Sequence, residues 1–254
     1  MNVLALDLGN SALKGALIDA DDGVRGAFRI AYDDLPEALD RALDGLSAKP
    51  DAIGLSSVVP AQTLRVTDVV RRRFAVPLVE VKAEMPWPFR VGYATPDTLG
   101  VDRLCAVAGA FERGAGPLVV VSAGTALTVE AVDASGTYVG GAIAPGPRLM
   151  ARSLARGTAQ LPEITVEPDP PAIGTTTAEA LEAGIVGMYA EGARGLVRRT
   201  RDALGAPDAP VVATGGFASL LAAWDAAAFG DVRPHLVLVG IARIVQKTLS
   251  EPRP

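Results

Sequence analysis

The chain has 254 residues, of which 49% are hydrophobic and 21% charged, and its formal net charge at pH 7 is −5. Such a length and composition are typical of one large globular domain or two small ones, and they exclude an intrinsically disordered chain. The negative net charge argues against a nucleic-acid-binding surface, for which a basic patch is expected. An anionic substrate would need a local positive pocket.

The single cysteine and the single histidine narrow the possible chemistry. Cys105 has no partner for an intrachain disulfide, and Cys105 and His235 together cannot form a zinc cluster. We expect Cys105 to be a small core residue of a helix and His235 to be a structural residue at the start of a buried strand. The chain has neither a signal peptide at its start nor an apolar run long enough to span a bilayer, which predicts a cytoplasmic location.

The first half of the chain is predicted to begin with three strands. Apolar runs at residues 3–6, 13–18 and 24–30 are separated by turn-forming residues. Leucines at helical spacing predict a helix over 35–46, and further elements follow as a strand (52–57), a helix (60 to about 74), a strand (77–81) and, after a proline-rich loop, a helix (99–111).

The second half repeats this start. Strands are predicted at 118–121, 126–132 and 137–144, again with a glycine turn between the first two. A helix with its connection (149–161), a long helix (176 to about 199), a strand (210–214), a strand (236–239) and a helix (241–249) complete the chain. The pattern predicts two lobes of the same β-β-β-α-β-α design, residues 1–115 and 116–254, with a cleft between them.

The first candidate site is the glycine turn at residues 7–14. Backbone N–H groups of such a turn can cradle phosphate oxygens, with contributions from Gly9, Asn10 and Ser11. Asp7 can hold hydrated Mg²⁺, and Lys14 can neutralise a phosphoryl group in transfer. The alternative is an ordinary β-hairpin with Asp and Asn as turn formers. Lys14 is one of only four lysines, on an otherwise apolar strand, which favours the functional interpretation.

The second candidate site is the matching turn at residues 122–128. The amides of Gly124 and Thr125 and the Thr125 hydroxyl could contact the β- and γ-phosphates, so two such turns facing each other would clamp a triphosphate. Gly215 and Gly216, after the strand at 210–214, would let a flat base or ribose approach the backbone. Two hairpins and a simple strand-to-helix turn are the structural alternatives. P-loop and Rossmann motifs are absent from the sequence.

The third candidate site lies at residues 93–103. Gly100 permits a turn, and Asp102 and Arg103 stand together at a predicted helix start. Asp102 could accept the proton of an attacking hydroxyl group, and Arg103 could bind a substrate carboxylate. The alternative is that Asp102 caps the helix while Arg103 forms a surface ion pair.

These motifs together resemble the type III pantothenate kinases, which belong to the actin-like superfamily that includes sugar kinases. The resemblance runs nearly end to end and rests on motifs in a specific order: Asp-x-Gly-Asn-Ser-x-x-Lys (7–14), Ser-Ser-Val-Val-Pro (56–60), Leu-Gly-Val-Asp-Arg (99–103), Gly-Thr-Ala-x-Thr (124–128), Gly-Gly-x-Ile-x-Pro-Gly (140–146), Thr-Ala-Gln-Leu-Pro (158–162) and Thr-Gly-Gly (214–216). It implies an α/β fold of duplicated actin-like (ribonuclease H-like) lobes, each a mixed five-stranded sheet with helices.

The resemblance also implies ATP-dependent phosphorylation of pantothenate to 4′-phosphopantothenate, the first step of coenzyme A synthesis. Asp102 would be the base. Pantothenate would be contacted by Tyr93, Gly100, Val101, Asp102, Arg103 and Thr177. ATP would be contacted by Asp7, Gly9, Asn10, Ser11, Lys14, Gly124, Thr125, Gly215 and Gly216.

The family is typically a homodimer in which the residue at Thr177 reaches the neighbouring subunit's pocket, and it uses Mg²⁺ and a monovalent cation such as K⁺ or NH₄⁺. Two positions depart from the family pattern. Ser122 stands where an Asp associated with the monovalent cation is usual, so the sequence leaves open whether this chain depends on such a cation. Thr176 stands where an Asn is common, and a small polar exchange there is expected to be tolerated.

Two other functions are consistent with parts of the pattern. A non-catalytic ATP-binding regulator would account for Ser122, but it would not need the acceptor-site pair Asp102 and Arg103. A related kinase or phosphohydrolase would use another small substrate, whereas Tyr93 and Thr177 in their motifs favour pantothenate over a sugar.

Overall fold

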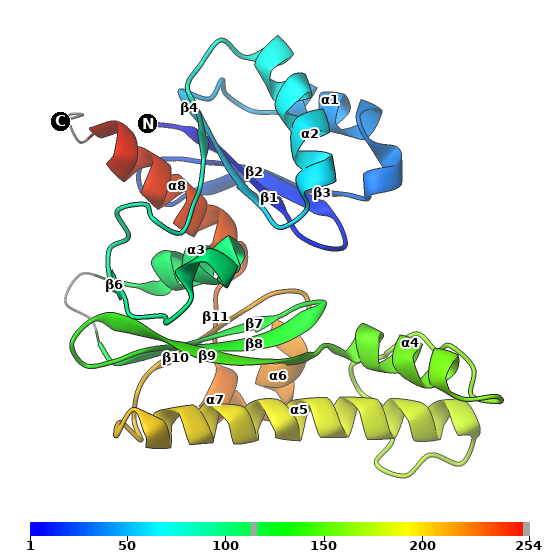
Figure 1. Ribbon diagram of the computed structural model, residues 1–254. Coiled ribbons are helices and arrows are strands. Elements are labelled where there is room, and N and C mark those ends of the chain that lie inside the picture. Colours follow the sequence, from blue (N-terminus) through cyan, green and yellow to red (C-terminus); the bar gives the residue numbers. More distant parts are fainter. Residues whose placement is uncertain (113–115, 251–254) are drawn as a thin grey trace. The chain divides into compact units, whose positions relative to one another are not determined.

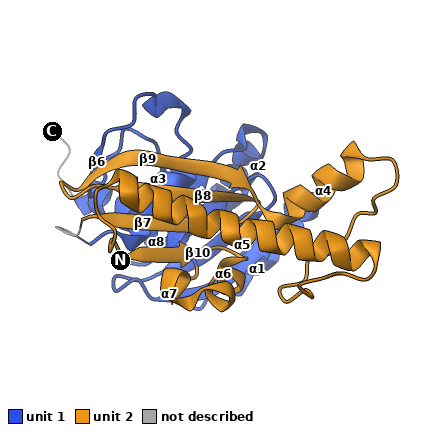
Figure 2. Cartoon of the chain, turned by 90° about the horizontal axis from the view of Figure 1, so that it is seen from below, with its two compact units in different colours: residues 1–113, 235–254 blue, residues 114–234 orange. Residues whose placement is uncertain are grey.

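The computed structural model describes residues 1–112 and 116–250, which fall into two compact units (Figure 2). Unit 1 contains residues 1–113 and 235–254, and unit 2 contains residues 114–234. The predicted boundary at 115/116 therefore adjoins residues 113–115, which lie outside the described part of the chain.

Unit 1 is built on a mixed five-stranded sheet of order β3-β2-β1-β4-β5 (Figure 1). The strands β1, β2 and β3 are antiparallel, whereas β4 and β5 run parallel to β1. The elements of this unit are β1 (Val3–Leu8), β2 (Leu13–Ile18), β3 (Val24–Ile30), a 3-10 helix (Tyr32–Asp34), α1 (Glu37–Asp44), β4 (Ala52–Ser57), α2 (Pro60–Arg73), β5 (Leu78–Glu80), β6 (Arg90–Val91), a 3-10 helix (Pro96–Thr98), α3 (Val101–Ala110) and α8 (Leu236–Ser250).

The side chains along the strands of unit 1 alternate between the two faces of the sheet, and both faces are buried. Leu4, Leu6 and Leu8 pack with apolar residues of α1 and α2. Because successive side chains of a strand point to opposite faces, Asp7 belongs to the other face. There α8 packs so closely that a Cβ atom on Gly54 would lie 2.5 Å from Ile241 Cγ2.

Helices α3 and α8 cross with their backbones in contact. A Cβ atom on Gly109 would lie 2.2 Å from the carbonyl oxygen of Leu236, and one on Gly240 would lie 1.9 Å from the carbonyl oxygen of Cys105. Two glycines thus permit this approach, which ties the last helix of the chain to unit 1.

The prediction for the C-terminal segment was wrong in two respects. Residues 236–239 form no strand but are the first turn of α8, and α8 belongs to unit 1 rather than to a lobe of residues 116–254. A short run of Leu and Val does not distinguish a buried strand from a helix that is buried on most of its surface. His235 does not begin a strand: it is exposed, has a φ angle of 61° and directly precedes α8.

Unit 2 repeats the topology of unit 1. Its strands follow the order β9-β8-β7-β10-β11, with β7, β8 and β9 antiparallel and β10 and β11 parallel to β7. Helix α5 covers one face of this sheet with α6 and α7 (Figure 1). The elements are β7 (Leu118–Ala123), β8 (Ala126–Val132), β9 (Thr137–Pro145), α4 (Pro147–Gly157), α5 (Thr177–Ala203), β10 (Val211–Thr214), α6 (Ala218–Trp224), α7 (Ala226–Phe229) and β11 (Asp231–Val232). The predicted duplication is confirmed.

Candidate active site

A row of three polar side chains crosses the sheet of unit 1 near the C-terminal end of β1. Asp7 pairs in register with Lys14 on β2 and with Ser56 on β4. Residues that pair directly on neighbouring strands point to the same face, so these three side chains lie side by side. Their face is opposite the one that carries Leu6 and Leu8. The structure therefore brings together Asp7 and Lys14, two of the residues that the sequence predicted.

Asp7 is a buried carboxyl group whose charge is only partly compensated. The residue is 5% exposed. The pKa of Asp7 is raised from 3.8 to about 6: burial is the largest cause, the Lys14 ammonium group acts to lower the pKa, and the Asp102 carboxyl group acts to raise it. Asp7 and Asp102 are thus close enough to repel each other, and ionisation of Asp7 is favoured by any additional cation.

The oxygens in this row fit a hydrated Mg²⁺ ion. Mg²⁺ usually keeps several waters and binds through one or two carboxylates together with substrate phosphates. Beside the Asp7 carboxyl group lies the buried Ser56 Oγ atom, whose one weak partner among the described residues is the Cys105 thiol. Residues 1–112 and 116–250 contain no group of three or more His, Cys, Asp or Glu side chains that could hold a metal ion. An open, water-mediated site is therefore the type that these residues support.

The turn between β1 and β2 is anchored by a tyrosine that sequence analysis missed. The Tyr32 hydroxyl group donates a hydrogen bond to the Gly9 carbonyl oxygen, while Asn10 and Ser11 remain exposed. Burial, followed by the negative charge of Asp7, raises the pKa of Tyr32 to about 12, so the phenol stays a donor at neutral pH. No local pattern connects Tyr32 with Gly9, because 23 residues separate them.

The start of α3 gathers the predicted acceptor-site residues. Asp102 Oδ1 accepts a hydrogen bond of 3.0 Å from the Arg103 backbone N–H group. The Arg103 guanidinium carbon lies 5.7 Å from the centre of the Tyr93 ring. A Cβ atom on Gly100 would lie 2.6 Å from Asp102 Oδ1, so the glycine leaves room for the carboxylate. Val101 is the first residue of α3.

Cys105 lies behind these carboxyl groups and is fully buried, as expected for a small core residue. Burial raises the pKa of its thiol well above the ordinary value, and the charges of Asp7 and Asp102 act in the same direction. A thiol that remains protonated is a poor nucleophile and a poor metal ligand. Cys105 therefore contributes packing to this site.

The corresponding row in unit 2 is neutral. Ser122 on β7 pairs in register with Thr128 on β8 and with Thr214 on β10. The Thr128 Oγ1 atom is buried and has no hydrogen-bond partner among the described residues. Hydroxyl groups alone do not supply the negative charge with which a carboxylate would hold K⁺, so this set of donors does not fit a tightly bound monovalent cation.

The backbones of two predicted nucleotide-binding turns of unit 2 are in close contact. Gly124 and Thr125 connect β7 to β8, and Gly215 and Gly216 follow β10. Gly215 has a φ angle of 97°, and a Cβ atom there would lie 2.4 Å from the Ala123 carbonyl oxygen. Gly215 therefore permits both the backbone conformation and the close approach of the two turns.

Thr177 is the first residue of α5 and is exposed. Its neighbour Thr176 forms a capping box: the Thr176 side chain accepts a hydrogen bond from the Glu179 backbone N–H group, and the Glu179 carboxylate accepts one from the Thr176 backbone N–H group. Thr176 therefore caps the helix.

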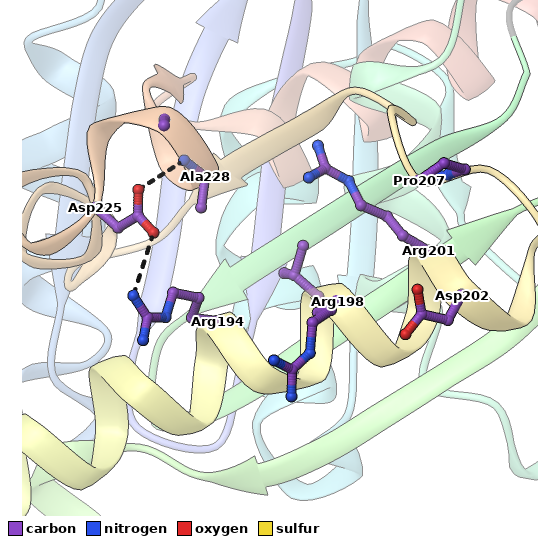
Figure 3. A pocket seen from close by; sticks show the side chains of 9 residues that line it. Arg194, Arg198, Arg201, Asp202, Pro207, Asp225 and Ala228 are labelled. Carbon is purple, nitrogen blue, oxygen red and sulfur yellow. Dashed lines mark hydrogen bonds and ion pairs between the residues drawn. The ribbon is translucent and has the colours of Figure 1, made fainter.

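A separate cavity of unit 2, of about 330 Å³, contains none of the predicted site residues (Figure 3). It lies beside the C-terminal half of α5, where Arg194 pairs with Asp225 and Arg201 donates two hydrogen bonds to the Ala209 carbonyl oxygen. Arg198 and Asp202 also line it.

No helix among the described residues is long and apolar enough to cross a membrane.

Comparisons with solved structures match the chain to actin-like folds. One neighbour, described as a conserved putative Baf family transcriptional activator from Campylobacter jejuni, has a TM-score of 0.59 at 19% identity and covers 99% of this chain and 100% of its own. A ROK family glucokinase from Streptomyces griseus, in complex with glucose and AMPPNP, has a TM-score of 0.51 at 15% identity and covers 97% and 100%. At these identities the likeness shows the fold alone.

Proteins found by comparison of sequences have a higher sequence identity to this chain than those solved structures. A protein named type III pantothenate kinase from Thermomicrobium roseum is 35% identical over 248 residues, which cover 94% of this chain and 95% of the relative. One of the same name from Roseiflexus sp. is 34% identical over 257 residues and covers 98% and 100%. The sequence profile of the type III pantothenate kinases matches residues 3–199. The chain belongs to the type III pantothenate kinase family.

Proposed function

We propose that this protein transfers the γ-phosphoryl group of ATP to pantothenate and forms 4′-phosphopantothenate and ADP. The observation that carries the proposal is the grouping of Asp7, Lys14 and Asp102 in unit 1, where Lys14 and Asp102 are both close enough to Asp7 for their charges to act on its carboxyl group. Phosphoryl transfer from ATP uses groups of these kinds: a carboxyl group for the metal, a cation for the phosphates and a base for the acceptor. The family to which the chain belongs supports pantothenate as the acceptor.

In the reaction, the terminal hydroxyl oxygen of pantothenate forms a bond to the γ-phosphorus while the bond from that phosphorus to the β,γ-bridging oxygen breaks. Asp102 accepts the hydroxyl proton, and ADP leaves. Lys14 offsets the negative charge of the phosphoryl group in transfer. Backbone N–H groups of the turns at Gly9 and at Gly124 hold phosphate oxygens.

Substrate recognition follows from the charges near α3. The net charge of the chain is −5, so a carboxylate substrate needs a local cation. Arg103 supplies one and binds the pantothenate carboxylate, with Tyr93 beside it. Thr177 acts from a neighbouring subunit, which makes a homodimer part of the proposal. Its α5 helix exposes Met188, 62% of which is accessible to solvent.

The residues of the site fit Mg²⁺ but not a monovalent cation. Asp7, with Ser56 beside it, would hold a hydrated Mg²⁺ ion, which supplies positive charge to the β- and γ-phosphates of bound ATP. The neutral row of Ser122, Thr128 and Thr214 does not fit a monovalent cation, and no step is assigned to one.

The test is a coupled assay for ADP release with ATP and Mg²⁺, in which pantothenate is compared with a panel of sugars and other hydroxy acids. The assay is repeated in K⁺, NH₄⁺, Na⁺ and buffer free of monovalent cations. Turnover that requires pantothenate is expected. If ATP binds and no acceptor supports turnover in any buffer, the protein is a non-catalytic ATP-binding regulator and the proposal fails. If another acceptor is preferred, pantothenate is the wrong substrate.

A further inference from the structure

Three backbone segments of unit 2 meet around the Gly124–Thr125 turn. The Gly146 N–H group donates a hydrogen bond of 3.0 Å to the Thr125 carbonyl oxygen, and the Phe217 N–H group donates one of 3.0 Å to the Ala123 carbonyl oxygen. A Cβ atom on Gly146 would lie 2.2 Å from the Gly124 carbonyl oxygen. The start of α4 and the segment after β10 are therefore both fixed against the proposed phosphate turn.

A cation–aromatic pair connects these two segments. Arg148, in the first turn of α4, places its guanidinium carbon 5.5 Å from the centre of the Phe217 ring. The ring is held in turn by an edge contact with Tyr189, whose ring centre lies 6.1 Å away. Phe217 comes directly after Gly216, the second glycine of the proposed base- and ribose-binding turn.

Arg148 is exposed. Among the ion pairs of the described residues, the next arginine along α4, Arg152, pairs with Glu163, whereas none involves Arg148. A guanidinium group that is supported on one side by an aromatic ring still offers its plane and its N–H donors to a ligand. Arginine planes and aromatic rings are surfaces on which nucleobases stack.

We propose that Arg148, supported by Phe217, binds the purine base of the nucleotide by stacking. The proposal rests on the function proposed above, since it assigns a residue to the nucleotide of that reaction. Position favours the base over the phosphates: Arg148 is directed to Phe217 beside Gly216, whereas the phosphates have the amides of Gly124 and Thr125.

The test measures binding of ADP by calorimetry, without pantothenate, to the wild type and to Arg148→Ala, Arg148→Lys and the control Arg156→Ala. Arg156 is an exposed arginine of the last turn of the same helix. We expect Arg148→Ala to weaken ADP binding about tenfold, since stacking of a base on such a surface is worth affinity of this order. Arg148→Lys, which keeps the charge but not the plane, should regain little of the loss, and Arg156→Ala should bind as the wild type does.

A second arm uses tripolyphosphate, which has no base, as the competing ligand. Its affinity should be the same for Arg148→Ala and the wild type. Full recovery of ADP binding in Arg148→Lys, or weaker tripolyphosphate binding in Arg148→Ala, would mean that Arg148 contacts phosphate, and the assignment to the base would be overturned. Unchanged ADP binding in Arg148→Ala would overturn it as well.

The two proposals fail in different ways. A wild type that binds ADP but phosphorylates no pantothenate refutes the proposed function and leaves the effect of Arg148 measurable. An active enzyme whose ATP KM and ADP affinity do not change in Arg148→Ala refutes only the present inference. A wild type that binds no nucleotide refutes both.

Discussion

Replacing Asp7 by Asn should abolish function and stabilise the fold. Burial raises the pKa of Asp7 from 3.8 to about 6, so the ionised carboxyl group is less stable in the folded protein than in the unfolded chain. A difference of about two pH units corresponds to about 3 kcal/mol at neutral pH. Since an amide group of the same shape carries no charge, Asp7→Asn should raise the free energy of unfolding at pH 7–8 by about 1–3 kcal/mol.

The pH dependence gives this prediction its sign. The folded state binds the Asp7 proton more tightly than the unfolded state does, so the wild type loses stability as the pH rises from 3.8 to about 6 and loses no more above that. The advantage of Asp7→Asn should therefore be present at pH 8 and largely absent at pH 3.5.

Urea denaturation in metal-free buffer at these two pH values measures the effect. The exposed Asp97 supplies the matched control, Asp97→Asn. If Asp7→Asn is no more stable than the wild type at pH 8, or if its advantage is equal at both pH values, then burial does not penalise the charge of Asp7 and the electrostatic description of the site is incorrect.

Three further changes test other parts of the structure. Gly215→Ala should cost about 2 kcal/mol of stability and weaken ATP binding, because Gly215 has a positive φ angle and lies close to the Ala123 carbonyl oxygen. The control Gly216→Ala, whose Cβ atom would meet nothing within 4 Å, should cost far less stability. Thermal unfolding of the two variants measures this difference. Thr176→Ala removes the helix cap and should lower the unfolding free energy by about 1 kcal/mol, and an unchanged melting temperature would count against the capping box. Ser122→Asp places a carboxylate in the neutral row and should make turnover more dependent on K⁺; the same salt profile as the wild type would show that this position does not govern the cation.

Sequence patterns predicted the duplicated strands because each strand is a short apolar run that ends at a glycine turn. The strands β2, β3, β4 and β8 lie within the predicted bounds. The position of Asp7 at a strand end could also be predicted from the sequence, because the motif Asp-x-Gly-Asn directly follows an apolar run. The burial of Asp7 could not be predicted, because it depends on the packing of α3 and α8 over the sheet.

The missed features are contacts between distant residues. Ser56 was recognised as part of a motif, but its place beside Asp7 follows from the register of β1 and β4. Tyr32 and Gly9, and likewise Arg148 and Phe217, meet only in the folded chain. The final helix was mistaken for a strand followed by a helix because Leu-Val-Leu-Val satisfies both patterns, and only its neighbours in the structure decide between them.

The central claim is that Asp102 acts as the base in phosphoryl transfer to pantothenate, and mass spectrometry of the product tests it most directly. Wild-type protein and Asp102→Asn would be incubated with ATP, Mg²⁺ and pantothenate, and 4′-phosphopantothenate would be quantified, with ADP affinity measured for both proteins. We expect the wild type to form the product and Asp102→Asn to form it about 10²- to 10⁴-fold more slowly with the same ADP affinity. Product formation at the wild-type rate by Asp102→Asn, or no product from the wild type, would contradict the account.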